Sequence, residues 1–215
     1  MDIVNPQVEA YMASLLSRYD EPVLLEMEAE GERRRFPIVG RLVGVTVELI
    51  ARGVGARRVF ELGSGFGYSA YWFARAVGPD GEVHGTDGDP ANEARAIGYL
   101  ERAGLADRLR WHVGDAVTSL GEIDGVFDVV YCDIDKDGYP DAWRAARERI
   151  RVGGLYLCDN VLWSGAVADP GAEHGRDRAT TQAIVEHNRL VAEDDRFVSS
   201  IVPTRDGVLV ALRIG

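Results

Sequence analysis

Two short sequences place acidic and amide side chains directly after apolar segments. The first, YCDIDK, covers residues 131–136, and the second, LCDN, covers residues 157–160. If both apolar segments are neighbouring parallel strands, their carboxyl ends meet at one edge of the sheet, and Asp133, Asp159 and Asn160 converge there. Three oxygen ligands without Cys or His favour Mg²⁺, or another divalent cation such as Mn²⁺ or Ca²⁺. We therefore expect a divalent metal site at this edge.

Lys136 lies in the first of these sequences. A lysine among acids is usually a solvated side chain that forms ion pairs. Beside a divalent cation, however, its pKa would be lowered, and it would take a proton from a substrate hydroxyl. The alternative interpretation of each acidic residue is that it caps a helix or solvates a loop. The combination favours a catalytic Lys136 next to a metal.

A glycine-rich sequence, ELGSGFG at residues 61–67, separates an expected strand from an expected helix. Glycines let the backbone approach a ligand, so Gly63 and Gly65 are candidate cofactor contacts. The spacing G-x-G-x-G differs from the dinucleotide fingerprint G-x-G-x-x-G, because bulky Tyr68 stands where a small residue is needed. Two acids, Glu61 and Asp87, border the expected crevice. They suit a cofactor with a ribose and a positive charge, which describes S-adenosylmethionine; alternatively, the glycines form a tight turn and Asp87 caps the next helix.

The elements that position these residues alternate between strands and helices. Near-continuous apolar strands separated by helices predict a mostly parallel α/β sheet that is covered on both faces. Asp206-Gly207 predicts a hairpin, so an antiparallel pair ends the sheet. Before the sheet we expect a helix that begins near Pro6, an exposed connection over residues 28–36 and an apolar helix over 39–53. Strands are expected at 59–62, 83–86, 109–113, 126–132, 155–158, 197–202 and 208–214, and helices at 68–77, 90–104, 140–150 and 180–191.

The composition fits one domain over residues 1–215, because 215 residues with 46% hydrophobic content build one full core. The formal charge of −11 disfavours nucleic acid as a partner. The sequence has two cysteines, no apolar leader and no apolar segment of membrane-spanning length. We therefore expect a cytoplasmic protein without a membrane partner.

These motifs resemble those of the class I cation-dependent O-methyltransferases, the family of catechol and caffeoyl-coenzyme A O-methyltransferases. The resemblance covers about residues 36–215 and depends on FELGSGFGYSA, GTDGDP, YCDIDKDGY, GGLYLCDNVLWSGAV and PTRDGVLVAL. It implies a Rossmann-like, seven-stranded methyltransferase sheet. It also implies cofactor contacts from Glu61, Gly63, Ser69, Asp87, Asp115, Ala116, Asp133 and Asp135, metal ligands at Asp133, Asp159 and Asn160, and Lys136 as the base.

The resemblance further implies a homodimer, with residues 1–53 contributing to oligomer contacts and to the acceptor site. The predicted reaction is Mg²⁺-dependent methyl transfer from S-adenosylmethionine to a small catechol-like aromatic acceptor. The alternatives are a non-catechol acceptor, a nicotinamide oxidoreductase and a non-catalytic protein that binds an adenosine ligand. Tyr68 and the lack of a Tyr-x-x-x-Lys pair disfavour the oxidoreductase. The sequence assigns no role to Arg33–Arg35, Trp163 or His174.

Overall fold

The computed structural model describes residues 4–171 and 175–215 and contains one seven-stranded sheet. The strand order is β3-β2-β1-β4-β5-β7-β6. The first five strands in the chain are parallel, and β7 pairs antiparallel with both β5 and β6. The strands are β1 (Arg58–Leu62), β2 (Glu82–Asp87), β3 (Leu109–Val113), β4 (Phe127–Cys132), β5 (Ile150–Cys158), β6 (Phe197–Val202) and β7 (Val208–Arg213). The predicted mostly parallel sheet with a C-terminal hairpin is confirmed.

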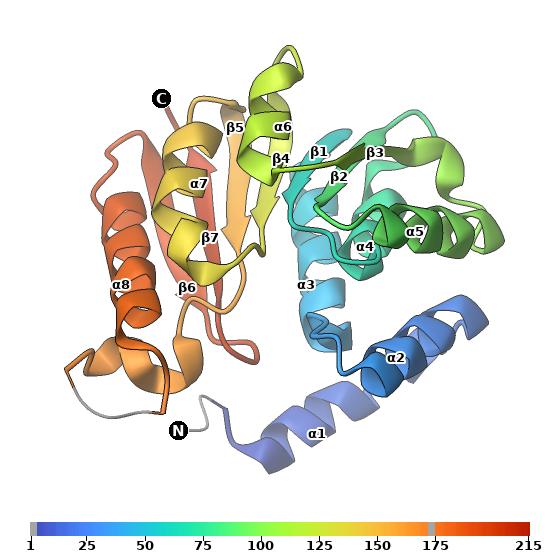
Figure 1. The fold of residues 1–215 in the computed structure, drawn as a ribbon, viewed down its shortest axis with the longest axis horizontal. Helices are drawn as coiled ribbons and strands as arrows, with labels where there is room; N and C mark the ends of the chain where they lie inside the picture. Colours follow the sequence, from blue (N-terminus) through green and yellow to red (C-terminus); the bar gives the residue numbers. More distant parts are fainter. Residues whose placement is uncertain (1–3, 172–174) are drawn as a thin grey trace.

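Helices cover both faces of the sheet, as near-continuous apolar strands require (Figure 1). One face packs against α3 (Gly40–Gly53), α4 (Tyr68–Val77) and α5 (Pro90–Arg102). The other packs against α6 (Ala116–Glu122), α7 (Tyr139–Ala146) and α8 (Arg178–Ala192). Along β1 the side chains alternate, so that Val59 enters the first core and Phe60 the second. Short 3₁₀ turns lie at Ser17–Tyr19, Ala106–Arg108, Lys136–Gly138 and Trp163–Ala168.

The N-terminal segment contains α1 (Pro6–Ser14) and α2 (Pro22–Arg34). The predicted exposed connection over residues 28–36 is therefore wrong, because most of it is the second half of α2. Charged side chains of α2 form tertiary contacts: Glu28 accepts hydrogen bonds from Tyr68 at 2.8 Å and from Arg41, and Glu30 accepts one from Tyr99. These partners stabilise a helix that its local sequence does not indicate.

The strand β5 begins five residues earlier than predicted. Gly153 and Gly154 were expected to lie in a loop before the strand, but they lie inside it, where the pairing with β4 shifts register between Phe127 and Val129. Gly153 has φ +76°, and a Cβ on Gly154 would stand 2.8 Å from the Asp128 carbonyl oxygen. The two glycines therefore form a β-bulge rather than a turn.

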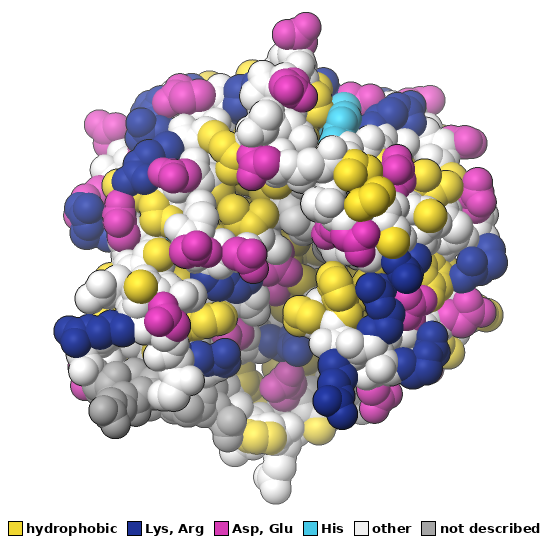
Figure 2. All heavy atoms as spheres, viewed as in Figure 1, with side chains coloured by type: hydrophobic (Ala, Val, Ile, Leu, Met, Phe, Trp, Pro, Cys, Tyr) yellow, Lys and Arg dark blue, Asp and Glu magenta, His cyan; other side chains and the backbone are white. Residues whose placement is uncertain are grey.

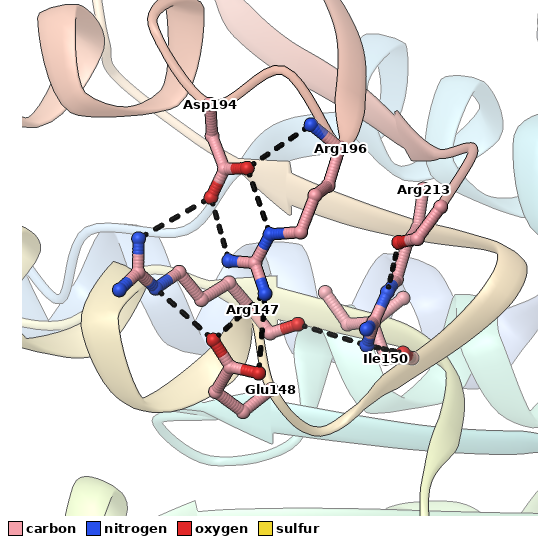
Figure 3. Close-up of polar contacts among 7 residues, drawn as sticks. Arg147, Glu148, Ile150, Asp194, Arg196 and Arg213 are labelled. Atoms are coloured by element: carbon pink, nitrogen blue, oxygen red, sulfur yellow. Dashed lines mark hydrogen bonds and ion pairs between the residues drawn. The ribbon is translucent and has the colours of Figure 1, made fainter.

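An arginine and carboxylate cluster joins the end of α8 to the turn after α7 (Figure 3). Asp194 accepts hydrogen bonds from the Arg196 guanidinium at 2.8 and 3.0 Å and from Arg147 at 3.3 Å. Glu148 accepts from Arg196 on the opposite side. The Arg196 hydrogen bonds lower the pKa of Asp194 to about 2. The cluster fixes the start of β6 to the turn between α7 and β5.

Within the described ranges, no helix is both long and apolar enough to cross a membrane.

Candidate active site

The carboxyl ends of β1, β4 and β5 lie level with one another. Leu62 is the register partner of Cys132, and Cys132 is the register partner of Cys158. The next residue of each strand, Gly63, Asp133 or Asp159, therefore leaves the sheet at the same level. Main-chain hydrogen bonds continue this alignment, because the Asp133 N–H donates to the Leu62 carbonyl at 2.9 Å and the Asp159 N–H donates to the Cys132 carbonyl at 3.1 Å. Sheet register thus brings the glycine loop and both predicted acidic ligands together.

The glycine loop is conformationally fixed by its own backbone. Gly63 has φ +84° and Gly65 has φ +53°, a region that favours glycine. A Cβ on Gly63 would lie 2.7 Å from the Asp133 carbonyl oxygen, and one on Gly65 would lie 2.7 Å from the ring of Phe36. The loop therefore requires glycine both for its dihedral angles and for its close approach to β4.

A hydrogen-bond network of two hydroxyl side chains fixes the loop to β2. The buried Thr86 hydroxyl donates to the Glu61 carbonyl at 2.7 Å and accepts from the Gly63 N–H at 3.0 Å. Ser64 accepts from the Thr86 N–H at 3.0 Å and donates to Glu61 Oε2 at 2.8 Å. Neither hydroxyl was expected in the site, because three of these four hydrogen bonds join residues 22 to 25 positions apart.

Glu61 lies fully buried behind the glycine loop. Burial raises the pKa of Glu61 to about 8, although hydrogen bonds from Ser64 and Ser69 oppose the rise and the nearby Asp133 charge adds to it. Its Oε1 atom has no hydrogen-bond partner within the described part of the chain. A buried carboxyl group with a free acceptor atom can bind a hydrogen-bond donor or positive charge of a ligand.

Asp87 and Asp115 line the opposite end of the cavity. Asp87 Oδ1 accepts hydrogen bonds from the Asp89 N–H at 2.8 Å and from Asn92 at 3.0 Å, which orient the carboxylate. The N-cap of α5 is Asp89 rather than Asp87, so the capping alternative for Asp87 is wrong. Asp115 does cap α6 by accepting from the Thr118 N–H at 2.8 Å. The adjoining Ala116 is buried and also lines the cavity.

Asp133, Lys136 and Asp159 line the end of the cavity at β4 and β5. Lys136 Nζ donates to Asp133 Oδ1 at 2.8 Å and to the Ile134 carbonyl at 3.3 Å. Burial lowers the pKa of Lys136, but the charge and hydrogen bond of Asp133 outweigh burial, so the net pKa is raised. The lowered pKa that we expect for Lys136 applies beside a bound metal and stays a prediction. Asp159 is 2% exposed, and burial followed by the Asp133 charge raises its pKa to about 7.

Asn160 and Asp135 complete the predicted set. Asn160 has φ +55°, a left-handed conformation that asparagine tolerates better than most residues, and its N–H donates to Asp159 Oδ1 at 2.8 Å. Asp135 precedes the 3₁₀ turn that contains Lys136. Across the described residues, no three His, Cys, Asp or Glu side chains form a metal-binding cluster. The candidate ligand set comprises two aspartates and an asparagine, so its third oxygen comes from an amide.

One cavity of about 1090 Å³ contains nearly all of these residues. Every predicted site residue lines it except Glu61, which lies behind the loop. Figure 2 shows this face hollowed near its centre, with acidic and basic side chains around the hollow. Lining residues that the sequence analysis did not place in the site include Phe36, Ser64, Thr86, Arg176, Arg205 and Asp206. Trp163 also lines it, whereas His174 lies outside the described residues.

Comparisons with known proteins agree with this architecture. The profile of the O-methyltransferase family matches residues 16–214. Caffeoyl-CoA O-methyltransferases from Petroselinum crispum and Pinus taeda are 30% and 31% identical, over 80% and 81% of this chain and 74% and 69% of theirs. The structure of the O-methyltransferase TomG from Streptomyces achromogenes, in complex with SAM, has a TM-score of 0.85 and 30% identity over 97% of this chain and 96% of its own.

A second solved structure, the O-methyltransferase from Bacillus cereus in complex with SAH, is 26% identical with a TM-score of 0.85, over 96% of this chain and 97% of its own. The chain belongs to the O-methyltransferase family. It is accordingly an O-methyltransferase, which decides against the nicotinamide oxidoreductase and the non-catalytic binding protein.

Proposed function

We propose that this protein transfers the methyl group of S-adenosylmethionine to one hydroxyl of a small vicinal aromatic diol, with a divalent cation in the site. The observation that carries the proposal is the convergence of Asp133, Lys136, Asp159 and Asn160 beside the glycine loop in one cavity. A methyl donor and an oxygen acceptor placed in one cavity react with a much smaller entropic cost than in solution.

The donor end of the cavity suits a sulfonium that carries adenosine. Gly63 and Gly65 permit close approach of the donor, and Ser69 lines the cavity at its methionine part, with the unpartnered Oε1 of the buried Glu61 behind the loop. The oriented carboxylate of Asp87 accepts hydrogen bonds from the ribose hydroxyls, and Asp115-Ala116 lies at the adenine. Asp133 and Asp135 line the same cavity from the segment after β4. The acidic lining favours a positively charged sulfonium over a pyrophosphate.

The side chains of Asp133, Asp159 and Asn160 are those that would hold the cation. The donor set fits a hard divalent ion, because carboxylate and amide oxygens are the ligands of Mg²⁺ and similar ions. Burial and then the charge of Asp133 raise the pKa of Asp159, and a bound cation would offset both effects. When bound, the cation supplies Lewis acidity that lowers the pKa of an acceptor hydroxyl.

Lys136 accepts the proton that the acceptor hydroxyl loses. Its raised pKa depends on Asp133, so the pKa falls when Asp133 is engaged by a cation. The neutral amine then takes the proton, the acceptor oxygen bonds to the methyl carbon, and the carbon–sulfur bond breaks with its electron pair moving to sulfur. The products are the methyl ether and S-adenosylhomocysteine.

The test is a methylation screen with Mg²⁺ over vicinal diols and matched mono-hydroxyl compounds, read by mass spectrometry. We expect single methylation of the diols and little or none of the mono-hydroxyl compounds. Failure to methylate any vicinal diol would count against the proposed acceptor. A Lys136→Met variant should lose most of its turnover at neutral pH, and wild-type turnover in that variant would remove Lys136 from the base role.

We also propose that the chain forms a homodimer through its N-terminal helices and acts in the cytoplasm. Three apolar side chains on or next to α1 support the dimer, because Val8, Tyr11 and Leu15 are 50%, 64% and 60% exposed. Both cysteines are free thiols, in keeping with a reducing compartment. Sedimentation of the wild type and of a Leu15→Glu variant tests the dimer, and a monomeric wild type would contradict it.

A further inference from the structure

Two arginines that line the cavity are far along the chain from every predicted site residue. Arg176 belongs to the segment before α8, and Arg205 belongs to the turn between β6 and β7. Both side chains are exposed. The proposed chemistry uses neither of them, although they add positive charge to a cavity whose other charged residues, apart from Lys136, are aspartates.

Neutral groups position both guanidinium groups. Arg205 Nη1 donates to the Ile38 carbonyl at 3.2 Å and to the Val39 carbonyl. These contacts hold Arg205 against the start of α3. Arg176 lies over the ring of Trp163, 4.4 Å from its centroid, and donates to Ser164 Oγ at 2.8 Å. Each arginine is thus held by neutral partners, and Asp206 lies near both of them but outside ion-pair distance.

Among residues 4–171 and 175–215, no carboxylate lies within ion-pair distance of Arg176 or Arg205. The acid next to Arg205 in the chain is Asp206, whose Oδ1 accepts a hydrogen bond from the Ser164 N–H at 2.5 Å. Arg41 and Arg75 show the contrast, because each forms ion pairs with two carboxylates. The cavity therefore presents two guanidinium groups whose N–H donors can bind an anion.

These arginines lie near the proposed acceptor position. The cavity that they line also contains Asp159 and Asn160, and its walls include the aromatic side chains Phe36 and Trp163. Main-chain hydrogen bonds join these regions, because the Trp163 N–H donates to the Asn160 carbonyl at 3.3 Å and the Leu162 N–H donates to the Asp206 carbonyl at 2.9 Å. An aromatic ring whose hydroxyls face Asp159 and Asn160 would thus have positive charge within reach of its substituents.

We propose that Arg176 and Arg205 form a carboxylate-binding subsite, so that the preferred acceptor is a vicinal diol that carries a carboxylate on its ring or on a short side chain. This inference rests on the proposed function, because it specifies the acceptor of the same site. A guanidinium fork matches a carboxylate in shape and charge. A single negative charge also suits the subsite better than a phosphate dianion, because Asp135, Asp137 and Asp206 line the same cavity.

The kinetic test compares 3,4-dihydroxybenzoate with 3,4-dihydroxybenzamide, which has a similar shape and no charge. The wild type should show a kcat/KM about tenfold or more higher for the acid, as expected for two exposed charge-assisted contacts. The Arg176→Gln/Arg205→Gln double variant should lose this preference through a higher KM for the acid, with the amide unaffected. Arg189→Gln is the matched control, because Arg189 lies on α8 outside the cavity lining and pairs with Glu193.

A binding measurement separates this inference from the proposed reaction. Benzoate, which has no hydroxyl to methylate, is titrated by calorimetry into the wild type and into the double variant, both with S-adenosylhomocysteine and Mg²⁺. We expect benzoate to bind the wild type and to bind the double variant about tenfold more weakly. Binding without any methylation of diols would refute the proposed function alone. No benzoate binding to the wild type, or an acid preference that persists in the double variant, would overturn the subsite.

Discussion

Gly63→Ala is the substitution that most directly tests how the glycine loop is built. An alanine at this position has two costs. The first is the positive φ of +84°, which disfavours a residue with a Cβ by about 1–2 kcal/mol. The second is the contact of that Cβ with the Asp133 carbonyl oxygen at 2.7 Å. Since that oxygen belongs to the backbone, it cannot move away as a flexible side chain would.

The matched control is Gly78→Ala. Gly78 has φ +75°, and a Cβ there would meet no heavy atom within 4 Å. With ψ −178° it lies in a region that is almost exclusive to glycine, so alanine there has at least as large a conformational cost and lacks the steric one. We expect the overlap at position 63 to cost a further 1–3 kcal/mol, roughly, because Asp133 is held in place by its hydrogen bond to Leu62.

The assay is calorimetric titration of S-adenosylhomocysteine into both variants, together with thermal unfolding. The overlap at position 63 displaces the loop that we expect to contact S-adenosylhomocysteine. The Gly63→Ala variant should therefore bind S-adenosylhomocysteine about 10- to 100-fold more weakly than the Gly78→Ala variant does. Gly78→Ala should keep wild-type affinity and lose only stability. Equal affinity of the two variants for S-adenosylhomocysteine would refute the reasoning that the close approach of the loop to β4 builds the donor site.

Three further predictions concern the network and the core. Thr86→Val should destabilise the protein by about 2 kcal/mol in urea unfolding, because the Gly63 N–H loses its acceptor. The control is Thr46→Val, since the half-buried Thr46 hydroxyl only donates to the Leu42 carbonyl one turn earlier in α3; an equal cost of the two variants would contradict the role of Thr86. Burial lowers the pKa of His187 to about 4, below its ordinary value of 6.5, so the unfolded chain binds the extra proton. The contribution of His187 to the free energy of unfolding should therefore be complete above pH 6.5 and fall by about 3 kcal/mol as the pH drops towards 4. The His187→Gln variant should lose less stability over this pH range, and the same pH profile in the variant and the wild type would refute the prediction. Asp194→Asn should cost about 1–2 kcal/mol, and Asp141→Asn, whose side chain is 81% exposed, should cost much less; equal melting temperatures would contradict the role of the cluster in Figure 3.

The sheet could be predicted from the sequence because strands buried on both faces leave continuous apolar segments. The position of the candidate site residues could be predicted from the same pattern, since the residues that follow parallel strands meet at one edge of the sheet. Gly63, Asp133 and Asp159 were thus expected together, and register places them level. Asp89 rather than Asp87 caps α5, a distinction that depends on hydrogen bonds between residues two positions apart.

Other features depend on contacts that a local sequence does not contain. The second half of α2 looks like a charged loop until its carboxylates meet Tyr68 and Tyr99, which lie forty to seventy positions further along the chain. The local sequence around Arg205 indicates only a turn, whereas in the structure its guanidinium donates to the Ile38 carbonyl just before α3. The charge and hydrogen bond of Asp133 raise the pKa of Lys136 in this structure, and the lowered pKa expected beside a metal stays a prediction.

The central claim is that Asp133, Asp159 and Asn160 hold a divalent cation at which a diol is methylated by S-adenosylmethionine. Its most direct test is methyl transfer to a vicinal diol by protein stripped of metal, followed by titration with Mg²⁺. The account predicts no product in excess EDTA and full recovery when Mg²⁺ is restored, with recovery abolished in Asp159→Ala. Undiminished methylation of the diol in excess EDTA would contradict it.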